Sequence, residues 1–322
     1  NVARSTGPAL GGVLVAAAGA TISFAINAVS YIGLVATLIW WKMPARKSTL
    51  PPEPLGAAIA SGLRYIRLSP PLLAILVRCF AFSVAASSMQ ALLPVVARDL
   101  LGGGARTYGV MLGGFGIGAM CGAVSSALLR ARYSSEVILR VLSGLSCLAA
   151  VGLGLSTWPV LSFLIYAVAG ATWMLGMSSF NIAVQFSSPR WVTGRTVASY
   201  QTIAFGGFAL GSWLWGELAH SFGVSAAMYA AGAAALVSLL ISRRVRVRVA
   251  QLDGLDPHDA ASVTAPQLDI RPSSGPIIVT VEYRVTEANA PVFISVINEL
   301  GRIRRRDGAR EWSICQDIDH PE

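Results

Sequence analysis

Carboxylate side chains are distributed very unevenly along this sequence. Of its 16 acidic residues, only Glu53, Asp99, Glu136 and Glu217 lie within the first 250 positions, and the other twelve lie in the last 72. A carboxylate in the hydrocarbon of a bilayer is costly in free energy. The asymmetry therefore predicts two environments, a long first part inside a membrane and a short tail of ordinary soluble composition.

The first part consists of apolar segments long enough to cross a bilayer, which takes about 20 residues of helix. The chain is 54% hydrophobic and 13% charged, whereas soluble proteins have roughly 25% charged residues. In lipid, an isolated segment satisfies its backbone polar groups only as a helix. The sequence predicts eight such segments: 4–18, 21–41, 72–97, 107–129, 136–156, 158–186, 196–219 and 222–242. We therefore expect an all-α polytopic membrane protein with about eight spans.

Basic residues occupy alternate ends of these segments. The net charge of +9 is spread over short turns rather than one patch, so we expect no nucleic-acid partner. The turns expected on the inner side are all basic: 42–70, 130–135, 187–195 and 243–248. The outer turns contain only Arg98 and Arg106. Because cytoplasmic loops carry the excess of Lys and Arg, we expect a multi-pass protein of the inner (plasma) membrane with its C-terminal tail in the cytoplasm.

The loop over 43–71 is the longest one between spans. Within it, Leu55, Ile59, Leu63 and Ile66 recur at helical spacing, with arginines beside them. This pattern is typical of a short amphipathic helix on the inner membrane surface. The alternative is a simple extension of the next span.

The tail changes character twice. Residues 249–275 are rich in Asp, Ser and Pro and are expected to be a linker. Strand-like alternation over 277–285 and 311–315 flanks an amphipathic helical pattern over 288–305. A β-α-β unit of this size does not hold a core alone. We expect part of an α+β ferredoxin-like domain over 276–322.

The sequence shows no sign of catalysis or of a bound cofactor. Its four cysteines have neither metal-site nor disulfide spacing, and it contains no Walker loop and no nucleophile–base pair. We expect no catalytic residues, no metal, no cofactor and no enzymatic activity. Because the chain opens without Met inside an apolar segment, we also expect it to be a fragment.

Several motifs resemble those of one transporter superfamily. Residues 5–12, Ser-Thr-Gly-Pro-Ala-Leu-Gly-Gly, resemble the G-P-x-x-G-G motif on the fifth helix of drug-exporting major facilitator superfamily transporters. Residues 93–100, 108–111, 114–118 and 189–195 are similar to helices seven and eight and the loop before helix eleven of its enterobactin-exporter-like branch. Residues 306–312 are similar to the extra domain of the subgroup often labelled transmembrane secretion effectors.

This resemblance covers the whole chain and implies its division into parts. The expected parts are 1–42, the end of an N-terminal bundle (helices five and six); 43–71, a cytoplasmic connector; 72–248, a C-terminal six-helix bundle; 249–275, the linker; and 276–322, a partial β-α-β domain. The first four helices of the superfamily are absent from this sequence.

Polar and aromatic residues on helices seven, ten and eleven are expected to line the central cavity that the resemblance implies. A side-chain amide is costly in hydrocarbon unless it faces water or a partner. The candidates are Ser87, Gln90, Trp173, Met177, Asn181, Gln185, Gln201 and Phe205. For each of them, an interhelical hydrogen bond or core packing is the alternative.

Glycines with small-xxx-small spacing are expected to allow close helix packing. The packing candidates are Gly7, Pro8, Gly11, Gly12, Gly114, Gly118 and Gly122. Glu217, followed one turn later by His220, is a candidate proton carrier or a solvated cap at the outer mouth. Arg4 and Arg78 lie near inner helix ends, where they could reach the headgroups or serve in gating.

Together these features predict a secondary active efflux transporter that works by alternating access and is coupled to protons. Its cargo would be a small amphipathic molecule such as a siderophore, an antibiotic or another metabolite. The expected partners are the lipid bilayer, this cargo and protons. The alternative is a membrane-anchored sensing or dimerisation protein that acts through its tail as a homodimer. A third possibility, a small monooxygenase tail, rests on fold analogy alone.

Overall fold

The computed structural model describes residues 2–41, 54–189, 191–247, 278–286 and 289–315. Throughout these residues the only regular structure is helical. The elements in chain order are α1 (Val2–Trp40), α2 (Leu55–Arg67), α3 (Pro70–Ala91), α4 (Leu93–Val95), the π-helix η1 (Val96–Leu100), α5 (Ala105–Arg132), α6 (Ser135–Leu155), α7 (Pro159–Phe186), α8 (Thr193–Phe222), α9 (Val224–Arg244) and α10 (Ala290–Asp307).

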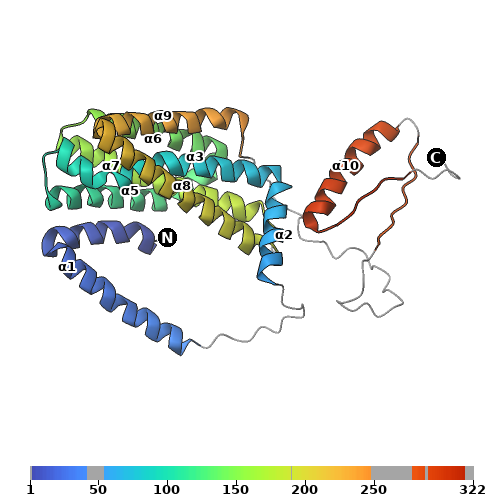
Figure 1. Cartoon of the computed structure of the whole chain (residues 1–322), viewed down its shortest axis with the longest axis horizontal. Helices are drawn as coiled ribbons and strands as arrows, with labels where there is room; N and C mark the ends of the chain where they lie inside the picture. Colours follow the sequence, from blue (N-terminus) through green and yellow to red (C-terminus); the bar gives the residue numbers. More distant parts are fainter. Residues whose placement is uncertain (1, 42–53, 190, 248–277, 287–288, 316–322) are drawn as a thin grey trace.

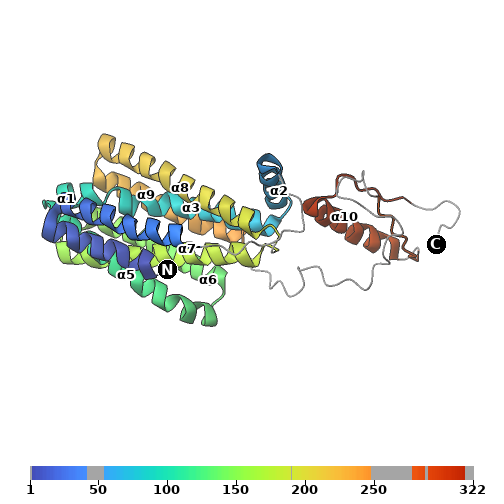
Figure 2. The same cartoon turned by 90° about the horizontal axis from the view of Figure 1, so that it is seen from below.

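Six long helices, α3 and α5 to α9, run side by side as a bundle (Figures 1 and 2). Within it, α5 packs on α7, α6 on α9 and α3 on α8. Short connections make successive helices antiparallel, so every second connection lies at the same end. One end collects arginines and is called the basic end here: Arg130, Arg132, Arg195, Arg243 and Arg244.

Six segments have the length and apolar composition needed to cross a membrane, within the residues that the structure describes. They are Thr21–Trp40, Pro70–Leu100, Ala105–Arg132, Ser135–Leu155, Pro159–Phe186 and Val224–Arg244. Six of the eight expected spans are thus found among these residues. The predicted segment 196–219 does form a helix, α8, but it is too polar to count as a candidate span. The predicted segment 4–18 is the short first arm of α1.

Helix α1 turns sharply at Gly19, whose φ of 79° and ψ of 170° are not helical. Glycine adopts this positive φ without the steric penalty that a Cβ would bring. The first arm of α1 lies along α5 (Figure 1), and the second arm, Thr21–Trp40, buries none of its residues within the described chain. The bend thus falls where the sequence predicts a break between two segments, at 19–20.

Helix α2 is a separate element that runs across the basic end of the bundle (Figure 1). It buries Gly62, Tyr65 and Ile66 and exposes Leu55 and Ile59. Proline at the start of α3 favours a break in front of it, because the ring disfavours helical geometry in the preceding residue. The expected amphipathic helix is confirmed, and the alternative of an extended span is wrong.

In the tail, the predicted helix is confirmed as α10, but the two predicted strands are not formed. Residues 278–286 and 311–315 carry no β-ladder in the described part. They lie against the helix through side chains instead, with the Tyr283 and Phe293 rings 5.4 Å apart and the Trp312 indole against Gly301. A strand needs a hydrogen-bonded neighbour, and β-branched composition alone does not provide one. The predicted linker 249–275 lies outside the described residues.

Candidate functional site

A line of polar, aromatic and sulfur side chains follows one face of α7. Trp173, Met177, Asn181 and Gln185 are spaced by four residues, which places them on one helix face. The Gln185 side-chain amide donates a hydrogen bond to Asn181 Oδ1. All except Gln185 are partly buried. The structure therefore brings four of the sequence-predicted cavity residues into one stripe.

Helix α8 lies beside this stripe and closes its edge with aromatic side chains. The Tyr200 hydroxyl donates a hydrogen bond of 2.8 Å to the Met177 carbonyl oxygen. The Phe208 ring meets the Trp173 ring edge to face, with 5.4 Å between centroids. Tyr200 and Phe208 were not among the sequence candidates, because the sequence alone does not say which aromatic residues of α8 face α7.

Two further candidates on α8, Gln201 and Phe205, lie one turn apart and are exposed, Phe205 by 61%. Together with the α7 stripe they make up a set of polar, aromatic and sulfur side chains on two neighbouring helices, which we call the α7–α8 wall: Trp173, Met177, Asn181, Gln185, Gln201 and Phe205. An exposed amide on a membrane helix implies contact with water, a ligand or another helix. The wall can thus bind a molecule that has both apolar and hydrogen-bonding groups.

The two candidates on α3 are placed differently. Ser87 is fully buried, and its hydroxyl donates a 2.8 Å hydrogen bond to the Val84 carbonyl oxygen of its own helix. It lies where α3 meets α8, because a Cβ on Gly211 would be 2.2 Å from Ser87 Oγ. Ser87 is therefore a helix-packing residue. Gln90, one turn beyond it, is partly exposed.

The glycines of α5 form its contact with α7. A Cβ on Gly118 would lie 1.7 Å from the Ala167 carbonyl oxygen, and one on Gly122 would lie 2.8 Å from that of Ala171. Gly114 is similarly covered by Phe163. The two backbones approach so closely that no side chain fits between them.

The close packing of the α5 glycines is not found at Gly11, in the motif expected on the first arm of α1. Gly11 has open space around it. Gly7, Pro8 and Gly12 form part of the helix, but their surroundings lie outside the described side chains, as does the Arg4 side chain.

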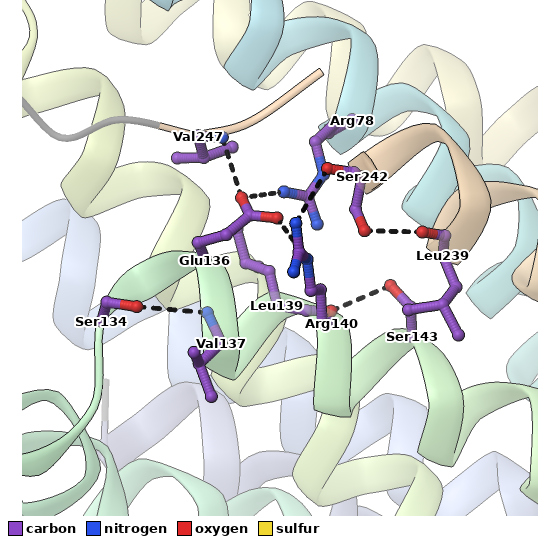
Figure 3. Close-up of polar contacts among 10 residues, drawn as sticks. All are labelled: Arg78, Ser134, Glu136, Val137, Leu139, Arg140, Ser143, Leu239, Ser242 and Val247. Carbon is purple, nitrogen blue, oxygen red and sulfur yellow. Dashed lines mark hydrogen bonds and ion pairs between the residues drawn. The ribbon is translucent and has the colours of Figure 1, made fainter. Parts of the chain in front are cut away.

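A charge cluster lies at the basic end of the bundle (Figure 3). Glu136, in the first turn of α6, accepts from Arg78 Nη1 at 2.5 Å and from Arg140 Nε at 2.7 Å. Its Oε2 atom also accepts from the Val247 backbone N–H at 2.8 Å. Arg140 donates in addition to the Ser242 carbonyl oxygen at 3.2 Å. One carboxylate thus joins α3, α6 and the chain segment after α9.

The burial of Arg78 and Glu136 determines how much this cluster contributes to stability. The Arg78 side chain is 2% exposed and that of Glu136 is 16% exposed, so the expectation that Arg78 reaches out to the headgroups is wrong. A buried pair gains little net free energy over an apolar pair, but removal of one partner costs about 3–5 kcal/mol because a buried charge remains. The cluster therefore fixes the arrangement of three chain segments more than it adds stability.

Sequence reasoning missed Glu136 and Arg140 as site residues, although signals for them exist. Glu136 is one of four carboxylates before residue 250 and precedes Arg140 by four positions, which places both on one helix face. Ser134 caps α6 by accepting from the Val137 N–H at 3.4 Å. Only the pairing of Glu136 with the distant Arg78 has no local signal.

The remaining candidates are solvent-facing. Glu217 and His220 are both exposed near the end of α8 opposite the basic end. All four cysteines are free thiols. Within the described ranges, no group of three or more His, Cys, Asp or Glu residues could hold a metal ion.

Comparison with known proteins gives a family for this arrangement. No curated protein matches the chain. The sequence does match a family described as transmembrane secretion effector over residues 1–322. The match includes every described helix, the α7–α8 wall and the charge cluster. The chain therefore belongs to the transmembrane secretion effector family of the major facilitator superfamily, a family of membrane transporters.

Proposed function

We propose that this chain acts as a secondary active efflux transporter for small amphipathic molecules, such as a siderophore, an antibiotic or another metabolite. The observation that carries the proposal is the α7–α8 wall, in which the exposed amides of Gln185 and Gln201 and the partly buried amide of Asn181 accompany aromatic and sulfur side chains on a bundle of membrane-like composition. Such a surface offers apolar area and a few directional hydrogen bonds, as small-molecule sites do. Family membership supports the same function.

Transport would proceed by alternating access, with movement of helix groups past a site near the middle of the membrane. The α5–α7 contact would pack these two helices closely within one helix group, because its glycines leave no side chain between the backbones. We propose protons as the coupling ion. Glu217 is the candidate carrier in this chain, since it is an exposed carboxylate one turn before His220.

The basic end would face the cytoplasm. Its arginines satisfy the positive-inside rule, and the tail leaves the bundle at this end, after Val247. Helix α2 would then lie in the plane of the inner leaflet. Its exposed Leu55 and Ile59 would enter the headgroup region, as amphipathic interfacial helices do.

Transport is tested with the full-length protein in proteoliposomes that hold an imposed pH gradient. The probe is ethidium, a fluorescent amphipathic cation. We expect dye movement that depends on the gradient and stops when a protonophore collapses it. Movement that is equal with and without the gradient, or absent for a panel of amphipathic dyes, would contradict the proposal.

A second candidate function is assembly through the tail. On α10, Val292 and Val296 lie on one face and are 66% and 62% exposed, and Ile278 and Val279 are still more exposed. A second copy of the tail could cover these side chains and make a homodimer. Light scattering of the solubilised protein tests this: a dimer should become monomeric in Val292→Glu/Val296→Glu, and a monomeric parent protein would argue against assembly.

A further inference from the structure

The last turns of α10 contact the end of α2 through two arginines. Arg302 Nη1 donates a 2.5 Å hydrogen bond to the Leu68 carbonyl oxygen, just after α2 ends. The Arg306 guanidinium lies 4.8 Å from the centroid of the Tyr65 ring. The arginines are four residues apart and so share one face of α10. Figure 1 shows this end of α10 approaching α2.

Both contacts are of a favourable kind. A cation near the C-terminal carbonyl groups of a helix is stabilised by the helix dipole, and hydrogen bonds from arginine are stronger than neutral ones. A guanidinium over a tyrosine ring adds a cation–π interaction. Tyr65 is only 1% exposed, so this ring is covered on both sides.

Helix α2 also contacts the start of α8, through the face that carries Tyr65. The Tyr65 ring meets the Trp191 ring at right angles, with 5.6 Å between centroids. Arg195 Nη1 donates a 2.5 Å hydrogen bond to Ser61 Oγ. A Cβ on Gly62 would lie 3.0 Å from Arg195 Cβ, so the α2 backbone rests directly on this arginine.

These contacts place α2 between the tail and a helix of the candidate site. Trp191 and Arg195 flank Thr193, where α8 begins, and Tyr200 and Gln201 follow on the same helix. Tyr65 is the shared residue, with Arg306 on one side and Trp191 on the other. The Tyr65 ring therefore contacts both α10 and a residue that lies two positions before α8 begins.

We infer that α10 is an intramolecular latch that, when docked, holds α2 against the start of α8 and slows the exchange between transporter conformations. The kinetic part of this inference rests on the proposed transport function. Because α10 belongs to the same chain, its effective concentration at α2 is high, and a few contacts are enough to populate the docked state. The same small number of contacts lets the latch open.

The docking is tested by distances between spin labels in the full chain in lipid nanodiscs, with the native cysteines replaced. One label pair, Ala60→Cys with Asn298→Cys, reports α2 against α10. A second pair, Ala60→Cys with Thr202→Cys, reports α2 against α8. All three positions are exposed. In the parent protein, both pairs should give narrow distance distributions.

The test variant is Arg302→Ala/Arg306→Ala, and its matched control is Arg304→Ala/Arg305→Ala. The control removes the same charge from two exposed positions of the same helix. We expect both distributions to broaden in the test variant and to stay narrow in the control. The latch proposal would be overturned if the distance distributions change equally in the two variants. It would also be overturned if the α2–α8 distribution stays narrow after α10 is released.

The kinetic consequence is measured by ethidium efflux from proteoliposomes. We expect a rate several-fold higher in the test variant and an unchanged rate in the control. An unchanged or lower rate in a test variant with released α10 would show that the contact is no latch on transport. If the parent protein moves no dye at all, the proposed function fails, whereas the two distances still decide whether α10 holds α2 in place.

Discussion

Arg78 Nη1 and Glu136 Oε2 lie 2.5 Å apart although the two residues are 58 positions apart in the sequence. The pair joins the third turn of α3 to the first turn of α6, and the Val247 backbone N–H also donates to Glu136. Because the tail leaves the bundle after Val247, this carboxylate also fixes the point from which the tail starts.

The substitution Glu136→Gln should lower the free energy of unfolding by about 3–5 kcal/mol, because it leaves the buried Arg78 guanidinium without its counter-charge. Arg140→Gln is the control, since Arg140 is 37% exposed and exposed pairs contribute about 0–1 kcal/mol. Unfolding in mixed detergent micelles measures both. Equal losses of unfolding free energy in the two variants would contradict the argument that burial sets the cost of breaking the pair. The double variant Arg78→Met/Glu136→Leu should be more stable than Glu136→Gln.

Gly118→Ala should separate α5 from α7, because the new Cβ would lie 1.7 Å from a backbone carbonyl oxygen. Overpacking of this kind typically costs about 1–3 kcal/mol. Gly113→Ala is the control on the same helix, where nothing lies within 4 Å of the added Cβ. The control should be neutral or slightly more stable, since alanine favours helix over glycine. Thermal unfolding of both variants tests this, and transport should fall in Gly118→Ala alone.

Gln201→Leu should weaken cargo binding at the α7–α8 wall. Loss of one hydrogen bond of about 1 kcal/mol corresponds to a roughly five-fold higher apparent KM. The control is the adjacent Thr202→Val, whose hydroxyl donates to the Ala198 carbonyl oxygen of its own helix at 3.1 Å. Concentration-dependent dye efflux measures both variants. An unchanged KM in Gln201→Leu would show that this side chain does not bind the cargo.

Tyr65 should ionise at higher pH than an ordinary tyrosine. Burial raises the pKa of Tyr65 above the ordinary value of 10.0, and the nearby Arg306 cation opposes this shift. Because the folded-state pKa is raised, the stabilisation from the neutral phenol is complete below pH 10.0 and is lost as the pH rises through the folded pKa. The latch should therefore loosen only in strong alkali.

The difference in tyrosinate absorbance between the parent protein and Tyr65→Phe isolates this titration. In parallel, the α2–α10 spin-label distance should broaden over the same alkaline range in the parent protein. Titration of Tyr65 together with the exposed tyrosines would show that the ring is not buried in solution.

The orientation of the bundle predicts which cysteines an impermeant thiol reagent reaches. Ser134→Cys, at the basic end, should react only after intact cells are permeabilised. Thr157→Cys, in the connection at the opposite end, should react from outside. Both positions border exposed connections, and the native cysteines are replaced in both variants. Labelling of Ser134→Cys in intact cells would reverse the orientation.

The helical bundle could be predicted from the sequence because an isolated segment in lipid satisfies its backbone polar groups only as a helix. The lengths of the apolar segments and the positions of the charged residues locate the helix ends. The break at Gly19 and the amphipathic helix α2 follow from local patterns. The lack of strands in the described part of the tail could not be predicted, since alternation over 277–285 does not say whether a neighbouring strand is present. For α8, helix formation was predictable, but Gln201 and Glu217 make it less apolar than its neighbours.

The candidate site was predictable only where its members share a helix. Asn181 and Gln185 stand out as amides in an apolar run, and their spacing places them on one face. Ser87 has the same local signal, yet it packs against Gly211 from a helix more than a hundred positions away. Contacts of this kind, like that of Arg78 with Glu136, depend on helix pairing that no local pattern encodes.

The uncovered second arm of α1 has a practical consequence. Thr21–Trp40 presents apolar side chains on every side, with Trp40 exposed by 84%. In a purified sample, surfactant molecules must coat this helix along its whole length. The chain should consequently bind far more surfactant than its bundle alone requires, and the choice of surfactant should decide whether the sample stays monodisperse.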